Sequence, residues 1–444
     1  MEIVHTKYGG ISGLKENGYT VYKGIPYAEP PVGELRFRAP VEVKPWDGIY
    51  RADTFKSKCM QSELPPEIQF YIKEFYSNPA FMPECSEDGL YLNIWTPAKD
   101  SSEKLPVAIW IHGGGFLGGF GSEMEFDGEA FCNQNVILVT INYRLNLFGF
   151  LAHEWLCEEN DKGVSGNYGL LDQIMALRWV YENIESFGGD AENITIFGQS
   201  AGAISVQTLI SSHLTGNMIK KAIMQSGGGY KNPLIQGKNL QDAKQIGEDF
   251  VQFGKINSLN ELREKTAEEL LFLMDEFLKQ KRQAGEKGLP FTPIVDGYVL
   301  TDGYDQLVEK GEIKEISYML GCCKDDVTVT TEAGENSPIY QGCTGFSHKL
   351  EELGKQPAYV YYFNRNLPGD DSGAFHSGEL WYMFGTLKRN WRPNSAADFE
   401  LSERMVTAWT NFIKNGDPNT NNKIEWMPYT SNNPYVQEFD LNSD

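Results

Sequence analysis

Gly198-Gln199-Ser200-Ala201-Gly202 is the first motif that could carry out chemistry, because it presents a serine hydroxyl between two glycines. It follows a short strand-like run, Ile194–Phe197, and opens an apolar helical pattern that reaches about Ile210. At a sharp turn from strand to helix the hydroxyl stands above the sheet edge, and glycines leave the space that a Cβ would fill. The helix N-terminus adds a positive dipole beneath a developing oxyanion. This context favours Ser200 as a nucleophile over a plain glycine-rich turn.

His112-Gly113-Gly114-Gly115-Phe116 is the second motif, and it follows the strand-like run Val107–Ile111. Successive glycines allow backbone N–H groups to point at one spot. Together with the N–H of Ala201, they could hold the negative oxygen of a tetrahedral intermediate. A phosphate-binding loop is the rival interpretation, but the Lys and Ser/Thr that such a loop needs are missing.

A serine nucleophile needs a base, and the chain has six histidines. His376 lies late in the chain, after a predicted strand, as expected for the chain order Ser, then acid, then His. Of the other five, His5 lies near the N-terminus and His112 belongs to the glycine loop. His153 and His213 precede any acid candidate, which is the wrong chain order, and His348 lies in a weakly patterned polar stretch. We therefore predict that His376 is the base.

The acid must lie between Ser200 and His376, at the end of a strand. Asp325 and Asp326 both follow the strand-like run Tyr318–Leu320. The acid would accept the second imidazole N–H, fix the tautomer and stabilise the imidazolium. Spacing alone does not choose between the two.

Strand-like runs alternate with helical patterns along most of the chain, which predicts an α/β fold with a mostly parallel central sheet and helices on both faces. Val136–Ile141 is typical of a strand buried on both faces, and Gly169–Tyr181 has helical spacing. Further strands are predicted at Ala222–Met224 and Tyr359–Phe363. No repeat or linker divides residues 1–444, so we predict a single domain.

The middle of the chain has a different pattern, which predicts a helical cap over the sheet. Ser258-x-x-Glu261 and Thr266-x-x-Glu269 are capping-box patterns, and the amphipathic helix that follows the second closes near Gly285. We expect cap-like insertions around residues 59–89 and 230–290. A last helix, from about Leu401 to Lys414, ends at a Gly-Asp-Pro stop signal.

Charge and composition exclude several classes of function. The 39 Lys and Arg against 61 Asp and Glu give a net charge of −22, which repels phosphate backbones and anionic lipid. No apolar run approaches the length of a membrane span, and no signal peptide is visible, so a cytoplasmic protein is the simplest expectation, or a secreted one if a signal was trimmed. The seven cysteines include no CxxC spacing, and neither a metal nor a cofactor is predicted.

These motifs together resemble the type-B carboxylesterase/cholinesterase family of α/β-hydrolases. Further similarities run along most of the chain: Lys23–Ala28, Pro30-Pro31-x-Gly33, Arg36-Phe37, Ser86–Ile94, Asn142–Arg144, Gly169–Gln173, Trp409–Phe412 and Gly416–Asn419. The resemblance implies an α/β-hydrolase fold and ester hydrolysis through an acyl-serine intermediate.

The resemblance also implies roles for single residues. It implies that Ser200 is the nucleophile, His376 the base and Asp326, at the family's K-D-E-G position, the acid. The oxyanion donors fall at Gly114, Gly115 and Ala201, and residues that support the acid and base fall at Ser226 and Glu379. Two structural ion pairs are implied as well, Arg36 with Glu87 and Arg144 with Asp172.

The chain departs from the family pattern at three places. Asp326 is one methylene shorter than the family's usual Glu. Gly89 replaces the cysteine that would pair with Cys59 in the family's early disulfide, and Cys85 is the nearby substitute. Only residues 327–356 separate Asp326 from the next strand, where the family has a longer helical segment that walls its active-site gorge.

We therefore expect a serine carboxylesterase that acts on small-molecule esters. A shorter wall predicts a wider cleft, and the segment from Cys59 to Gly89 is rich in Phe and Tyr, which suits aryl or feruloyl-type esters. The alternatives are a general short-chain aliphatic carboxylesterase, a thioesterase or amidase using the same residues, and a non-catalytic cholinesterase-like binding protein. The sequence does not indicate an oligomeric state.

Overall fold

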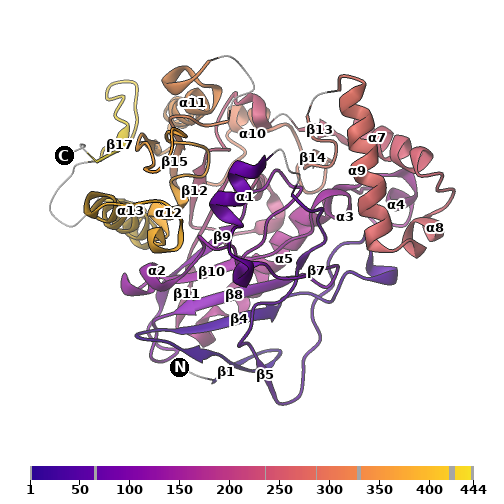
Figure 1. Cartoon of the computed structure of the whole chain (residues 1–444), viewed down its shortest axis with the longest axis horizontal. Helices are drawn as coiled ribbons and strands as arrows, with labels where there is room; N and C mark the ends of the chain where they lie inside the picture. Colours follow the sequence, from indigo (N-terminus) through magenta and orange to yellow (C-terminus); the bar gives the residue numbers. More distant parts are fainter. Residues whose placement is uncertain are drawn as a thin grey trace.

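A ten-stranded mixed sheet forms the centre of the computed structural model, which describes residues 3–64, 68–235, 237–286, 288–327, 332–419 and 426–441. Its strand order is β17-β16-β15-β12-β11-β9-β10-β8-β4-β3 (Figure 1). In chain order the strands are β3 (Leu14–Lys15), β4 (Thr20–Pro26), β8 (Tyr91–Thr96), β9 (Leu105–Ile111), β10 (Ile137–Ile141), β11 (Gly189–Gln199), β12 (Lys221–Gln225), β15 (Ser317–Cys323), β16 (Tyr359–Phe363) and β17 (Gln437–Phe439).

Parallel pairing connects all the strands from β10 to β17, and antiparallel pairing is confined to β8, β4 and β3 at the other edge. The mostly parallel sheet predicted from the sequence is therefore confirmed. All five residues of β10 are buried, as expected for a β-branched run covered on both faces. In register, Gly198 at the end of β11 lies opposite Ile111 of β9, so the two glycine motifs leave the sheet side by side.

Helices cover both faces of the sheet, and alternate residues of one strand contact the two layers. On β9, Val107, Ile109 and Ile111 belong to one hydrophobic core, whereas Ala108 and Trp110 belong to the other. The first core includes apolar residues of α5 (Tyr168–Asn183), α6 (Ala201–Ser211), α7 (Leu240–Phe253), α9 (Ala267–Gln283) and α11 (Pro338–Glu352). The second includes those of α2 (Glu129–Asn133), α12 (Leu380–Met383) and α13 (Ala396–Asn415).

The two segments predicted as insertions lie outside the large sheet. The first contains β6 (Lys58–Cys59), α1 (Gln69–Phe75) and β7 (Cys85–Ser86), and the second contains β13 (Lys238–Asn239), α7, α8 (Leu259–Glu264) and α9 (Figure 1). Thr266 and Glu269 form the predicted capping box at the start of α9. At α8, Ser258 caps the helix, but the carboxylate of Glu261 accepts from the N–H of Asn257 instead of Ser258.

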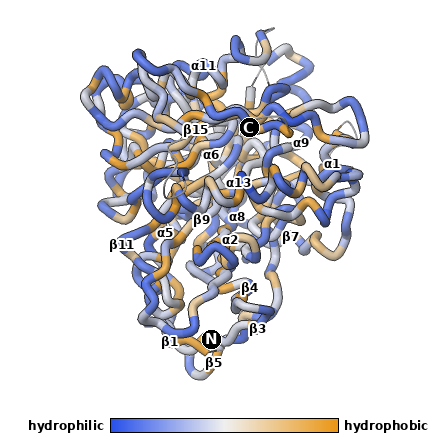
Figure 2. Tube along the Cα trace, turned by 90° about the vertical axis from the view of Figure 1, so that its left-hand side faces the viewer, coloured by the Kyte–Doolittle hydropathy of each residue, from blue (hydrophilic) through white to orange (hydrophobic). Residues whose placement is uncertain are grey.

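The short segment before β16 builds one long helix, which covers the sheet. Residues 328–331 lie outside the described part. After them, α11 buries Ile339 and Phe346. The ring of Phe346 contacts Tyr318 of β15, and the ring of Tyr340 contacts Tyr362 of β16. Figures 1 and 2 place α11 at the opposite end of the molecule from the small sheet of β1 (Ile3–Thr6), β2 (Gly9–Ser12) and β5 (Ile49–Arg51).

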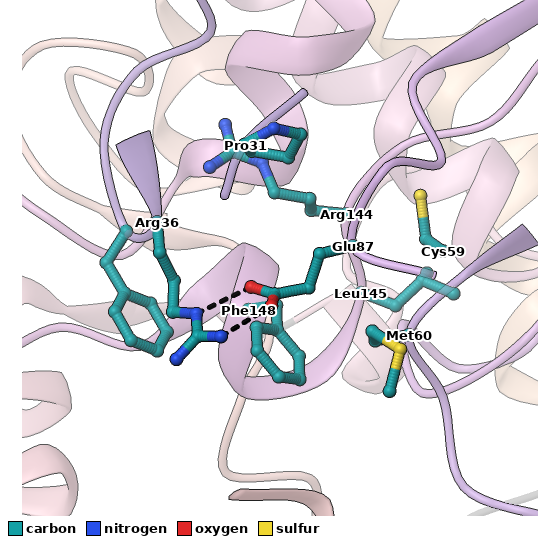
Figure 3. A pocket seen from close by; sticks show the side chains of 9 residues that line it. Pro31, Arg36, Cys59, Met60, Glu87, Arg144, Leu145 and Phe148 are labelled. Atoms are coloured by element: carbon teal, nitrogen blue, oxygen red, sulfur yellow. Dashed lines mark hydrogen bonds and ion pairs between the residues drawn. The ribbon is translucent and has the colours of Figure 1, made fainter. Parts of the chain in front are cut away.

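Both implied ion pairs are confirmed. Arg36 Nε donates to Glu87 Oε1 at 2.6 Å, and Arg144 Nε donates to Asp172 Oδ2 at 2.8 Å. Figure 3 shows the Arg36–Glu87 pair beside a cavity of about 10 Å³, which Cys59 also lines. Cys59 and Cys85 carry free thiols, so the substitute disulfide is not formed. The parallel pairing of β6 with β7 places Lys58, and not Cys59, opposite Cys85.

Two further properties concern the described residues as a whole. No helix among them is both long and apolar enough to cross a bilayer. Likewise, the described ranges contain no cluster of three or more His, Cys, Asp or Glu side chains with the spacing of a metal site.

Candidate active site

Ser200 occupies a strained turn between β11 and α6. Its φ of 57° and ψ of −124° are unfavourable for a residue with a Cβ, and such strain persists only where the surrounding structure holds it. The Ser200 N–H donates to the carbonyl of Gln225 at 2.8 Å. A Cβ on Gly202 would come within 2.0 Å of the Ile111 carbonyl oxygen, so the close approach of helix to strand requires glycine there. The turn leaves the Ser200 side chain partly exposed, as the motif predicted.

His376 and Asp326 are hydrogen-bonded through His376 Nδ1 and Asp326 Oδ1. Both side chains are buried. Burial alone would lower the pKa of His376. The charge and hydrogen bond of Asp326, together with the charge of Glu379, raise that pKa by more than burial lowers it, so the net shift is upward. Two backbone N–H groups, those of Cys323 at 3.1 Å and Val327 at 2.9 Å, also donate to the Asp326 carboxylate.

Asp325 has a different place from its neighbour. It is exposed, and its Oδ2 accepts from the N–H of Ala374 at 2.8 Å, while its own N–H donates to the Ala374 carbonyl at 3.0 Å. These two hydrogen bonds connect Asp325 to the loop that carries His376, and Asp325 has no hydrogen bond to the imidazole within the described residues. Of the two aspartates, only Asp326 has a hydrogen bond to the imidazole among the residues that the structure describes.

Gln199 contacts the imidazole from the residue before Ser200, a contact that the sequence analysis did not anticipate. Its Nε2 lies 3.2 Å from His376 Nε2 and 3.4 Å from Nδ1, and its side chain is buried. No hydrogen bond joins the Ser200 hydroxyl to His376 within the described residues. Such bonds are often long in an unliganded enzyme and shorten when substrate binds.

The glycine loop lies directly beside Ser200. A Cβ on Gly113 would lie 3.2 Å from the Cβ of Ser200, and Gly114 and Gly115 have positive φ values of 95° and 64°. A Cβ on Gly114 would overlap the carbonyl oxygen of Gly118 at 2.1 Å, so the loop depends on glycine at that position. The glycine loop therefore packs against the turn that carries Ser200, which Ala201 follows at the start of α6.

His112 and Gln61 support this loop. The His112 ring stacks on Tyr143 with 4.4 Å between centroids, and its Nδ1 lies 3.0 Å from the Gly113 carbonyl oxygen. Burial lowers the pKa of His112 to about 4, so the ring is neutral at ordinary pH. Gln61 accepts from the N–H of Gly119 and donates to its carbonyl, both at 3.0 Å. No sequence signal pointed to Gln61, which lies far from the loop in the chain.

Ser226 and Glu379 are both buried near the same strand ends. The Ser226 N–H donates to the Gly321 carbonyl, but its hydroxyl has no hydrogen-bond partner among the described residues, Asp326 included. Glu379 accepts from the thiol of Cys323 at 2.9 Å and from the amide of Gln225 at 3.4 Å. Burial raises the pKa of Glu379.

Comparison with known proteins identifies the family. Residues 1–343 and 337–444 match the model of the Carboxylesterase family. The chain belongs to this family. It is a carboxylic ester hydrolase with the α/β-hydrolase fold. The two matched stretches overlap at residues 337–343, which lie in the short segment between Asp326 and β16.

Individual relatives match almost the whole chain. Fumonisin B1 esterase from Sphingopyxis macrogoltabida is 31% identical over 95% of this chain and 83% of its own length. Para-nitrobenzyl esterase from Bacillus subtilis (strain 168) is 32% identical over 96% of this chain and 92% of its own. A thermophilic PNB esterase structure has a TM-score of 0.86 at 30% identity, covering 99% of this chain and 96% of that chain. Carboxylesterase EST55 of Geobacillus stearothermophilus has a TM-score of 0.83 at 31% identity, covering 100% and 97%.

Apolar groups of this carboxylesterase surround the candidate site on two sides. Next to His376, the Phe375 ring contacts Phe70 of α1 edge-on at 4.8 Å, and Phe75 lies behind at 6.4 Å. Burial, together with the charge of Asp326, raises the pKa of Tyr71 to about 12. On the other side, Leu289 is 38% exposed, and its Cδ1 lies 3.4 Å from the position of a Cβ on Gly115.

Proposed function

We propose that this carboxylesterase hydrolyses esters through an acyl-serine intermediate, with Ser200 as nucleophile, His376 as base and Asp326 as acid. The observation that carries the proposal is the hydrogen bond between His376 Nδ1 and Asp326 Oδ1, close to the strained Ser200 turn. That bond leaves His376 Nε2 as the nitrogen that receives a proton. It also favours the tautomer in which Nδ1 carries its own proton.

The first half of the reaction forms the acyl-enzyme. The Ser200 oxygen attacks the ester carbonyl carbon while its proton passes to His376 Nε2. The N–H groups of Gly114, Gly115 and Ala201 would hold the negative oxygen of the tetrahedral intermediate, and Asp326 stabilises the imidazolium. The intermediate then collapses, the bond to the alcohol oxygen breaks, and His376 returns the proton to the leaving alcohol.

The second half repeats these steps with water. A water molecule gives a proton to His376 and attacks the acyl carbon. The ester bond to Ser200 breaks, the proton returns to the serine oxygen, and the carboxylic acid leaves. The neutral His112 takes no part in these transfers, because its low pKa and its position against the Gly113 carbonyl keep it from accepting a proton.

We propose aryl and feruloyl-type esters as substrates in addition to short aliphatic esters. Phe70 supports this, because its half-buried ring packs edge-on against the buried Phe375 next to His376 and still offers surface against which an aromatic group can pack. Among the described residues between Asp326 and β16, α11 is the one α-helix, and it buries its apolar side on the sheet, which supports an open cleft. One relative, the para-nitrobenzyl esterase, is named for the ester of an aromatic alcohol.

A kinetic panel tests both parts of this proposal. It compares acetyl, butyryl, cinnamoyl and feruloyl esters of one alcohol, and then methyl ferulate with a feruloyl sugar. We expect turnover of the aromatic acyl esters and of the feruloyl sugar, with KM near ~1 mM because an open cleft makes few contacts. Inert feruloyl esters beside well-hydrolysed acetate and butyrate would instead indicate a general short-chain carboxylesterase.

A further inference from the structure

A second cavity, of about 390 Å³, lies apart from the candidate active site. Its walls come from residues 35–41, from the region between α4 (Glu154–Glu158) and the start of α5, and from residues 296–299. None of its lining residues belongs to the nucleophile, base, acid or glycine loop described above. The volume lies within the range of small-molecule sites.

The cavity has mainly apolar walls. Its apolar lining residues are Leu35, Phe37, Ala39, Val41, Leu156, Val164, Leu171 and Val299. Phe37 and Leu156 are fully buried, whereas Val41 is exposed at the edge. A ligand with an aromatic or alicyclic body would replace water on the apolar walls that solvent reaches, such as those of the half-buried Leu35, Val164 and Leu171.

Two buried polar side chains that line the cavity retain unused hydrogen-bonding capacity. Tyr168 is 2% exposed, and its hydroxyl makes no hydrogen bond within the described residues. Asp296 is 8% exposed; its Oδ1 accepts from three backbone N–H groups, those of residues 298, 299 and 300, whereas its Oδ2 has no partner in the described part of the chain. Buried polar groups normally have partners, so these two are available to a ligand.

The remaining charges at the cavity are largely balanced by neighbours. Glu159 accepts from Arg38 at 3.0 Å and from Arg263 at 2.9 Å, and Lys162 lies 5.8 Å from the centre of the Tyr298 ring. Asp161 also lines the cavity, next to Lys162 in the chain. The lining residues are two cations, Arg38 and Lys162, and three anions, Glu159, Asp161 and Asp296. Arg263 does not line the cavity, but it pairs with Glu159 and supplies the third positive charge, so the charges around the cavity balance, which favours a neutral ligand.

We propose that this cavity is a second, non-catalytic binding site for a neutral molecule with an aromatic or alicyclic body and one hydroxyl group. The ligand hydroxyl donates to the Oδ2 of Asp296 and accepts from the Tyr168 hydroxyl, a pairing that only a group with both functions completes. The alcohols and phenols that ester hydrolysis releases belong to this chemical class.

The test uses 2-naphthol as the probe and the enzyme after phosphorylation of Ser200 by diethyl p-nitrophenyl phosphate, which blocks the active site. We expect one saturable site by fluorescence titration. Tyr168→Phe and Asp296→Asn should each weaken 2-naphthol binding about 3- to 10-fold, the range expected for one lost hydrogen bond. Naphthalene, which lacks the hydroxyl, should bind more weakly than 2-naphthol by a similar factor and should not respond to either substitution.

Tyr181→Phe is the matched control, because Tyr181 lies on the same helix α5 but its hydroxyl donates to Glu192, outside the cavity. Turnover of p-nitrophenyl acetate by all three variants before phosphorylation checks that they fold. Absence of a saturable site, or equal affinities for naphthol and naphthalene in wild type and variants, would overturn the proposal. Tighter binding of 2-naphthylmethylamine that is lost in Asp296→Asn would overturn the assignment of a neutral ligand.

Discussion

His376 and Asp326 are hydrogen-bonded although an aspartate stands where the family usually has the longer glutamate. Further hydrogen bonds hold the Asp326 carboxylate and connect its loop to that of His376. Backbone N–H groups of Cys323 and Val327 donate to Asp326, and the adjacent Asp325 pairs with Ala374 in the loop of the histidine.

Ser200→Ala should abolish covalent turnover and leave the fold intact, because it removes one hydroxyl from a partly exposed turn. We expect the rate to fall about 10³–10⁶-fold, with some residual catalysis from the oxyanion donors. Hydrolysis of p-nitrophenyl acetate measures the loss, and mass spectrometry after treatment with a fluorophosphonate checks the labelled residue. Near wild-type activity, or a label elsewhere, would refute the assignment of the nucleophile.

The pH dependence of kcat/KM should report His376. The imidazole must be neutral to accept the Ser200 proton, so activity rises as pH increases through its pKa. Asp326 raises that pKa above its ordinary value of 6.5, so we expect the midpoint above 6.5. Glu379→Gln should shift the midpoint toward acid, because the charge of Glu379 contributes to the raised pKa. A flat profile from pH 5 to 9 would contradict the role of His376.

Asp326→Asn and Asp325→Asn form a matched pair of substitutions at neighbouring positions. Asp326→Asn should lower kcat about 10²–10⁴-fold, because the amide favours the wrong imidazole tautomer. Asp325→Asn should cost far less, since an amide oxygen can still accept from the N–H of Ala374. The ratio of the two kcat values is the measurement, and a greater loss in Asp325→Asn would reverse the assignment of the acid.

The sequence predicted those elements whose local pattern is strong. Continuous β-branched or aromatic runs gave β10 and β16, and the capping box at Thr266 gave the start of α9, because each depends on neighbouring residues only. The turn at Ser200 and the glycine loop were predictable for the same reason. Their motifs combine a strand end with glycines whose Cβ atoms would clash.

Contacts between distant residues could not be predicted in this way. Gln61 holds Gly119 from 58 positions away, and Phe70 contacts Phe375 across most of the chain. Neither contact has a periodic signal, because each depends on how the segment between residues 59 and 89 lies against the sheet. The choice of Asp326 over Asp325 also required either a family pattern or the three-dimensional path of the loop.

Glu123 offers a prediction about how stability changes between about pH 4.5 and pH 7. It is buried just after the glycine loop, where its Oε1 accepts from the N–H of Phe120 at 2.8 Å and its Oε2 from the Tyr76 hydroxyl at 3.2 Å. Burial raises its pKa from 4.5 to about 7, and the neighbouring Glu125, also buried, has a raised pKa as well. The folded protein therefore holds a proton on Glu123 that the unfolded chain releases above pH 4.5.

This proton makes the free energy of unfolding fall as pH rises from about 4.5 to about 7, after which the effect levels off. Glu123→Gln keeps an acceptor for Phe120 and removes the ionisation, so its unfolding free energy should fall less between pH 5 and 8. We expect a difference on the order of 1–3 kcal/mol, measured by urea unfolding at both pH values. Glu403→Gln, an exposed change on α13, should behave as wild type. If Glu123→Gln loses as much stability as wild type over this range, Glu123 is not the group that binds the proton.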